Sequence, residues 1–208
     1  MLQWAWERDC PWDEKAVCPL AAGGGHLEVL QWAREHGYPW DEETCYLAAF
    51  GGHLEVLQWA RKHDCPWDEE VCSFAARGGH LEVLRWARAH DCPWSQEVLY
   101  NAVEGGHLAV LQYAWKHDCP GVQDGMCLLA AAYGQLGVLK WAREIGCEWN
   151  ETTCYNAALG GHLEVLRWAR EHGCPWDSMT SIAANQGGHA ETIEYVRANG
   201  CRQAKCFE

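Results

Sequence analysis

Hydrophobic residues follow a helical pattern in the middle of the chain. Between residues 53 and 62 they share one helical face, which holds Leu54, Val56, Leu57, Trp59 and Ala60. The charged and amide side chains of the same segment lie off that face. This spacing of three and four residues predicts an amphipathic helix, and a proline at position 66, two residues past its expected end, is a normal stop.

A shorter helix is predicted just before it. Asp41 precedes that segment as an N-cap, because its carboxylate can accept a hydrogen bond from a free first-turn N–H. Cys45, Ala48 and Ala49 share one face, and such small side chains let a neighbouring helix approach closely. The glycine pair at 51–52 ends the helix. Equivalent cap residues recur along the chain: Asp13, Asp68, Ser95, Asn150 and Asp177.

This pair of patterns repeats along the whole chain. A glycine pair precedes a histidine at His26, His53, His80 and His107, each 27 residues after the last, and the step resumes at His162 and His189. Periods of about 20 to 50 residues are the signature of solenoids. Helices of about 8 and 10 residues are too short to persist alone, so the units must stack to bury their apolar faces. The predicted fold is all-α, an α-solenoid of stacked helix-turn-helix repeats without clear β-hairpins.

We expect one repeat array over residues 1–208. Its units span about 24–50, 51–77, 78–104, 105–132, 133–159 and 160–186, with a partial unit at 1–23 and a cap or partial unit at 187–208. The first residues read as the inside of a second helix, and the last residues read as the start of another unit. Two alternatives stay open here: a fragment or truncated gene, and a complete short protein.

Charge excludes several classes of partner. Sixteen Lys and Arg stand against 29 Asp and Glu, a net charge of −13. Nucleic acids and anionic membranes present phosphates that such a chain repels, so neither is expected as a partner. No apolar run approaches the ~20 residues of a membrane span, and no secretory signal is visible. The 13 Cys are therefore expected to be reduced thiols in a cytoplasmic protein.

The unit resembles an ankyrin repeat in the segment from Thr44 through Ala48 and Ala49 to Gly-His-Leu-Glu-Val-Leu, and the resemblance covers essentially the whole chain. It departs from that family in three ways. The period is 27 residues rather than about 33, the Thr-Pro-Leu-His turn is absent, and a short Cys-Pro-Trp-Asp connection replaces the long hairpin loop. In style the units are similar to short ankyrin-like repeats of giant amoeba-infecting viruses and of some algae and oomycetes.

This resemblance implies a protein-binding scaffold and no enzyme activity. The partner would bind the concave face and the acidic loops, and the charge of those loops favours a partner with a basic surface. In the viral proteins such arrays are often attached to an F-box that recruits ubiquitin-ligase machinery. No F-box is visible here, so that partner would require an upstream domain. A viral protein of this kind would act on host proteins in the host cytoplasm.

Thirteen Cys and 11 His raise an alternative function, a metal-binding or redox-responsive protein. His63, Cys65 and Cys72 could supply three of the four ligands that zinc prefers. However, cysteine does not recur at the equivalent position of every unit, because Leu99 and Ser181 stand where other units have Cys. We therefore favour packing of small buried thiols and expect no metal or other cofactor. No residue set typical of a catalytic site occurs.

The histidines and the tryptophans that recur at equivalent positions of the units have structural interpretations. The repeated histidines are expected to cap a helix or to bridge to the adjoining unit. Large aromatic side chains dominate burial in small repeats, so the loop tryptophans are predicted to be wedges between units. Stacking on nucleic-acid bases is disfavoured by the neighbouring Asp and Glu. These tryptophans are Trp40, Trp67, Trp94, Trp149 and Trp176.

Departures from the repeat point to candidate binding residues. Trp115 replaces the arginine of other units, Gly121 replaces the loop tryptophan, and Trp6 has the same unit position as Trp115. Two interpretations of Trp115 stay open: an exposed anchor for a partner, and a side chain folded over the gap left by Gly121. Ankyrin-like binding faces are also built from variable positions, which here include Phe50, Arg77, Glu104 and Leu159.

The two interpretations of Trp115 predict different results for Trp115→Ala. If Trp115 is an anchor, the substitution weakens partner binding by ~2 kcal/mol or more at an unchanged melting temperature. If it is a core residue, the melting temperature falls and the binding of the folded fraction is unchanged. Titration calorimetry with a partner and thermal unfolding of the same samples separate the two.

Overall fold

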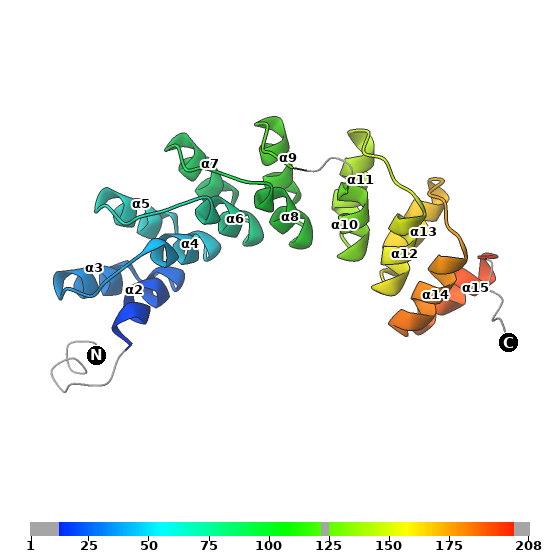
Figure 1. Cartoon of the computed structure of the whole chain (residues 1–208), viewed down its shortest axis with the longest axis horizontal. Coiled ribbons are helices and arrows are strands. Elements are labelled where there is room, and N and C mark those ends of the chain that lie inside the picture. Colours follow the sequence, from blue (N-terminus) through cyan, green and yellow to red (C-terminus); the bar gives the residue numbers. More distant parts are fainter. Residues whose placement is uncertain (1–12, 122–124, 202–208) are drawn as a thin grey trace. The chain divides into compact units, whose positions relative to one another are not determined.

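The computed structural model describes residues 13–121 and 125–201, and Figure 1 shows their helices in pairs. Within these ranges the chain forms fourteen helices and no strand, which confirms the all-α prediction. Each pair consists of a first helix and a second helix. The first helices are α2 (Glu14–Gly23), α4 (Glu42–Phe50), α6 (Glu70–Arg77), α8 (Glu97–Glu104), α10 (Met126–Ala132), α12 (Glu151–Leu159) and α14 (Ser178–Gly187).

The second helix of each pair follows the glycine pair. These helices are α3 (Leu27–Glu35), α5 (Leu54–Lys62), α7 (Leu81–Ala89), α9 (Leu108–Lys116), α11 (Leu136–Glu144), α13 (Leu163–Glu171) and α15 (Ala190–Ala198). The pairs belong to two compact units. The first contains α2 to α8 and α9 from residue 109, and the second contains residues 106–108 and α10 to α15. None of the helices described is long and apolar enough to cross a membrane.

The predicted caps start the first helices. The Asp41 carboxylate accepts a hydrogen bond from the Glu43 N–H at 3.1 Å, and the Asp177 carboxylate accepts one from Met179 at 2.9 Å. These bonds satisfy first-turn donors that have no partner inside the helix. The same bond to the N–H two residues on occurs at all the other predicted caps: Asp13, Asp68, Ser95 and Asn150.

The core is built from small residues on the first helices and aliphatic residues on the second. In the first unit α2, α4, α6 and α8 pack one against the next, and in the second unit α10, α12 and α14 do the same. Ala48 and Ala49 are fully buried in such contacts. Leu57 on α5 is fully buried as well, as are its counterparts Leu30, Leu84, Leu111, Leu139 and Leu166. Every unit therefore contributes the same layer to the core.

The repeated histidines link neighbouring helix pairs. His53 Nε2 donates a hydrogen bond to the Gly23 carbonyl at 3.1 Å, and His80 Nε2 donates to the Phe50 carbonyl at 2.9 Å. His162 Nε2 donates to the Ala132 carbonyl at 2.9 Å. A carbonyl only accepts, so Nε2 carries the proton in each case. The predicted bridge is confirmed at these positions, whereas capping is not, because the ring makes no cap hydrogen bond to its own helix.

The glycine pair makes room for these rings. At Gly51 a Cβ atom would lie 2.5 Å from Cδ2 of His53. At Gly52 the φ angle is +74°, which disfavours other residues, and a Cβ atom would lie 2.4 Å from Nδ1 of His80 in the next unit. The Gly-Gly-His motif is therefore one packing arrangement, in which two glycines accommodate two successive imidazoles.

The histidine bridge gives a prediction about stability. We expect His80→Ala to lower the free energy of unfolding by about 1 kcal/mol, because the Phe50 carbonyl loses its bond across the unit boundary. His80→Gln should retain most of the stability, since Gln135 stands at the same unit position in this chain. Urea unfolding followed by circular dichroism measures both. A loss as large for His80→Gln as for His80→Ala would show that the ring acts by packing alone.

Candidate functional site

Four predicted binding residues occupy the same place in the fold. Phe50, Arg77, Glu104 and Leu159 are the last residues of α4, α6, α8 and α12, and all are exposed. Phe50 is 44% exposed and Leu159 37%. Within the first compact unit, Phe50, Arg77 and Glu104 therefore end three consecutive first helices. Trp6 lies outside the residues described.

An aromatic cluster adjoins Phe50 on the first helices. The Tyr46 ring stacks on the Phe74 ring with centroids 4.6 Å apart, and Phe50 meets Phe74 edge-on at 6.0 Å. Leu20 of α2, the first helix that packs against α4, is 68% exposed. We call Tyr46, Phe50 and Phe74 the apolar patch. Sequence analysis missed two of its members, although the i,i+4 spacing of Tyr46 and Phe50 was a signal that they share a helical face.

Carboxylates adjoin the Tyr46 end of the apolar patch. The pKa of the Tyr46 hydroxyl is raised to about 12 by burial, by a hydrogen bond to Glu43, and by the negative charges of Glu43, Glu70 and Asp41. Glu43 and Glu70 are themselves exposed at the starts of α4 and α6. We call Asp41, Glu43 and Glu70 the acidic rim of the patch.

Trp115 belongs to a different part of the structure. It lies on α9, a second helix, and its side chain is partly buried. Phe50, Arg77 and Glu104 all end first helices, so the structure does not gather the predicted residues into one site. Whether Trp115 anchors a partner stays a prediction.

The loop tryptophans are wedges, as predicted. The guanidinium of Arg61 lies 4.3 Å from the centre of the Trp67 ring, and Trp67 in turn meets Trp86 of the next second helix edge-on at 5.8 Å. Arg61 also donates a hydrogen bond to the Cys65 carbonyl, which fixes its position. The other loop tryptophans pack against an arginine in the same way: Arg34 on Trp40, Arg88 on Trp94, Arg143 on Trp149 and Arg170 on Trp176.

A histidine completes four of the five rows of rings. His172 stacks on Trp168 with centroids 4.2 Å apart, and its Nδ1 donates to the Trp168 carbonyl at 2.8 Å. His63 makes the same two contacts with Trp59. The row of Trp176 ends at Tyr195, because Asn199 stands at the histidine position. An arginine, a loop tryptophan and an aromatic ring of the second helix therefore recur as one group between successive second helices.

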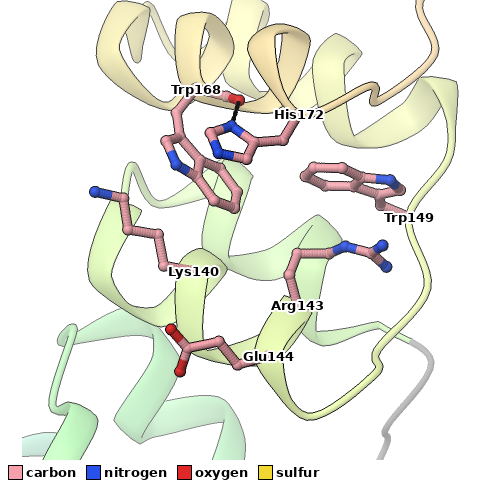
Figure 2. Close-up of a pocket in the computed structure, with 6 residues that line it drawn as sticks. All are labelled: Lys140, Arg143, Glu144, Trp149, Trp168 and His172. Carbon is pink, nitrogen blue, oxygen red and sulfur yellow. Dashed lines mark hydrogen bonds between the residues drawn. The ribbon is translucent and has the colours of Figure 1, made fainter.

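Open clefts lie between second helices at these groups. The cleft between α11 and α13 has a volume of about 530 Å³. Similar clefts of about 560 Å³ and 640 Å³ lie between α3 and α5 and between α5 and α7. Figure 2 shows the first of them, with Trp168 and His172 facing Lys140 and Arg143. Its remaining lining residues are Glu144 and Trp149.

The cysteines pack inside each unit. The Cys65 thiol donates to the Asp41 carbonyl at 3.4 Å, and Cys92 donates to the Asp68 carbonyl at 3.2 Å. Cys65 also forms a thiol–thiol hydrogen bond with Cys45. All described thiols are buried except that of Cys119, which is partly buried. The loop thiols therefore tie the end of a helix pair, such as α4 and α5, to the start of the first helix of the same pair.

The zinc-ligand set considered from sequence does not form. His63 is exposed and stacks on Trp59, whereas Cys65 is buried against the Asp41 carbonyl. Within residues 13–121 and 125–201, no group of three or more His, Cys, Asp or Glu side chains could hold a metal ion. The predicted ligands His63 and Cys65 therefore do not converge, because the exposed imidazole and the buried thiol belong to different layers of the fold.

The buried thiols predict a loss of stability at high pH. Burial raises the pKa of Cys18 to about 11 and that of Cys127 to about 12, from a usual value near 9. The folded state holds these protons more tightly than the unfolded state. Their contribution is therefore complete below about pH 9 and is lost as the pH rises towards 11 and 12. We expect the melting temperature, measured with a reductant, to fall in this window.

The control for this prediction is the double variant Cys18→Ala, Cys127→Ala. It removes two of the titrating groups and should show a shallower fall of melting temperature above pH 9. A fall as steep as in the unsubstituted chain would assign the effect to other groups.

Comparison with known proteins identifies the fold. No family model matches the sequence, and none of the curated proteins compared with it does either. Among solved structures, the crystal structure of the human ASB11 ankyrin repeat domain is similar, with a TM-score of 0.61 and 15% sequence identity over 76% of this chain and 84% of that one. The helix pairs described above thus have the fold of an ankyrin-repeat solenoid.

Proposed function

We propose that the chain is a protein-interaction scaffold that binds a basic partner through the first-helix surface around the apolar patch. The observation that carries the proposal is the exposure of Phe50 in an aromatic cluster whose Tyr46 lies beside the carboxylates of Asp41, Glu43 and Glu70. The ankyrin-repeat fold supports a role in binding other proteins, and ASB11 supplies a solved example of that fold.

The apolar patch can supply binding energy. Burying a side chain of the size of Phe or Leu contributes ~1.5–3 kcal/mol. Tyr46 and Phe74 are half-buried and held by their stacking contact, so they lose little freedom when a partner covers them. Such rigid aromatic anchors near the centre of an interface are typical of binding hot spots.

The rim supports a basic partner. Asp41, Glu43 and Glu70 are exposed beside the patch, and the chain as a whole has a net charge of −13. Charge of this sign accelerates encounters with a positive surface and disfavours negative ones. The resemblance to viral ankyrin-like proteins adds ubiquitin-ligase machinery as one candidate partner to look for among the proteins retained.

We predict that the chain retains a recurring partner from a reducing cell lysate at low salt, and that the amount falls at high salt because ions screen the rim. Phe50→Ala should weaken the binding of that partner by ~2 kcal/mol. Glu43→Gln combined with Glu70→Gln should lower both the affinity and its salt dependence. Mass spectrometry identifies the partner, and calorimetry with the purified partner measures the affinities.

The matched control is Glu28→Gln combined with Glu82→Gln. It changes the net charge equally but on α3 and α7, which are second helices, where both residues are exposed. If this control weakens binding as much as the rim variant, the effect is one of overall charge, and the assignment to the first-helix surface is wrong.

A further inference from the structure

We propose that the cleft between α11 and α13 binds an acidic peptide segment of a protein, with its carboxylates at Lys140 and Arg143 and an apolar side chain against the wall formed by Trp149 and Trp168. The cleft lies on second helices, so this surface is separate from the first-helix surface proposed above. The two surfaces also have opposite charge.

Arg143 offers a fixed cation without an internal counter-ion. Its guanidinium lies 4.4 Å from the centre of the Trp149 ring and donates to the Cys147 carbonyl, a neutral partner. Within residues 13–121 and 125–201, no carboxylate forms an ion pair with Arg143. A guanidinium has five N–H donors, so donors remain after the carbonyl bond. A carboxylate that approaches Arg143 meets a cation that needs no reorientation.

Lys140 distinguishes this cleft from those at α3/α5 and α5/α7 at one unit position. Its ammonium lies 5.9 Å from the Trp168 ring, three residues before Arg143 on the same helix. The same position holds Gln31 and Gln58 in those two clefts, and Arg85 and Arg167 on α7 and α13. In the α11/α13 cleft Lys140 and Arg143 thus stand one helical turn apart, with Glu144 as its single acidic lining residue, whereas the cations of the α5/α7 cleft are the adjacent Arg61 and Lys62.

The tryptophans form an apolar wall for the cleft. Trp149 and Trp168 are half-buried and meet edge-on at 5.8 Å. The volume of about 530 Å³ falls within the usual range of ligand pockets and suits one or two side chains of a peptide. Figure 2 shows Lys140 beside Trp168 and Arg143 beneath Trp149.

The same contacts exclude a basic ligand. A cation would seek the faces of Trp149 and Trp168, but Arg143, Lys140 and the stacked His172 already lie against these rings. It would also be repelled by the two cations. Partner specificity at this cleft is therefore the reverse of that proposed for the acidic rim.

The test uses the full chain and a fluorescein-labelled probe peptide of repeated Glu-Glu-Leu, titrated at low salt with fluorescence anisotropy. We expect saturable binding that Lys140→Gln, which restores the residue of the counterpart clefts, weakens about threefold to tenfold. Lys140→Arg, the residue found at Arg85 and Arg167, should retain the affinity. Lys15→Gln on α2 removes the same charge from a first helix and should have no effect.

Three results would overturn the proposal. One is equal loss in Lys140→Gln and Lys15→Gln, which would mean that net charge alone acts. Another is equal or tighter binding of a single-stranded oligonucleotide, which would show that the cleft does not select an acidic peptide. The third is no binding of the acidic probe at millimolar concentration. The rim variant Glu43→Gln, Glu70→Gln should leave acidic-probe binding intact, so this test and that of the first-helix surface can fail separately.

Discussion

Close contact between the first helices is the constraint on which the rest of the structure depends. Each helix pair is too short to be stable alone, so an apolar face must be covered by the next unit. The small faces around Cys45, Ala48 and Ala49 allow that approach, and all three residues are fully buried. Once the first helices pack in this way, the histidine bridge and the loop tryptophan meet the same partners in successive units, which explains why the motif recurs with so little change.

The histidine bridge also explains why one position varies freely. His80 bonds to the backbone carbonyl of Phe50 and not to its side chain. Glycine, phenylalanine and alanine occupy the accepting position in the bridges at Gly23, Phe50 and Ala132. Because the fold uses only the carbonyl there, the side chain is released for binding. This is a physical reason for the variation that first marked Phe50, Arg77, Glu104 and Leu159 as candidates.

Because the units repeat, charged residues that stabilise the ends of single helices also determine the charge of two surfaces of the protein. Acidic residues at the N-terminus of a helix and basic residues near its C-terminus both complement the helix dipole. The first helices carry acids such as Glu43 and Glu70 in their first turns, and the second helices carry arginines such as Arg61 and Arg143 in their last turns. Acidic first turns recur on α2, α4, α6, α8 and α12, and basic last turns recur on the second helices, so local helix ends become an acidic surface on the first helices and cationic clefts on the second. The two proposed binding surfaces follow from this arrangement.

Local patterns in the sequence were sufficient for the helices, their caps, the glycine pair and the role of the loop tryptophans, because these features depend on residues a few positions apart. Local patterns did not show which side chains of neighbouring helices would meet. Tyr46 and Phe74 come together from different helices, and His63 and Cys65 point to separate layers although they are two residues apart. The clefts likewise require residues from two second helices and the loop between them. Such contacts are decided by how the helices cross, which only the tertiary structure specifies.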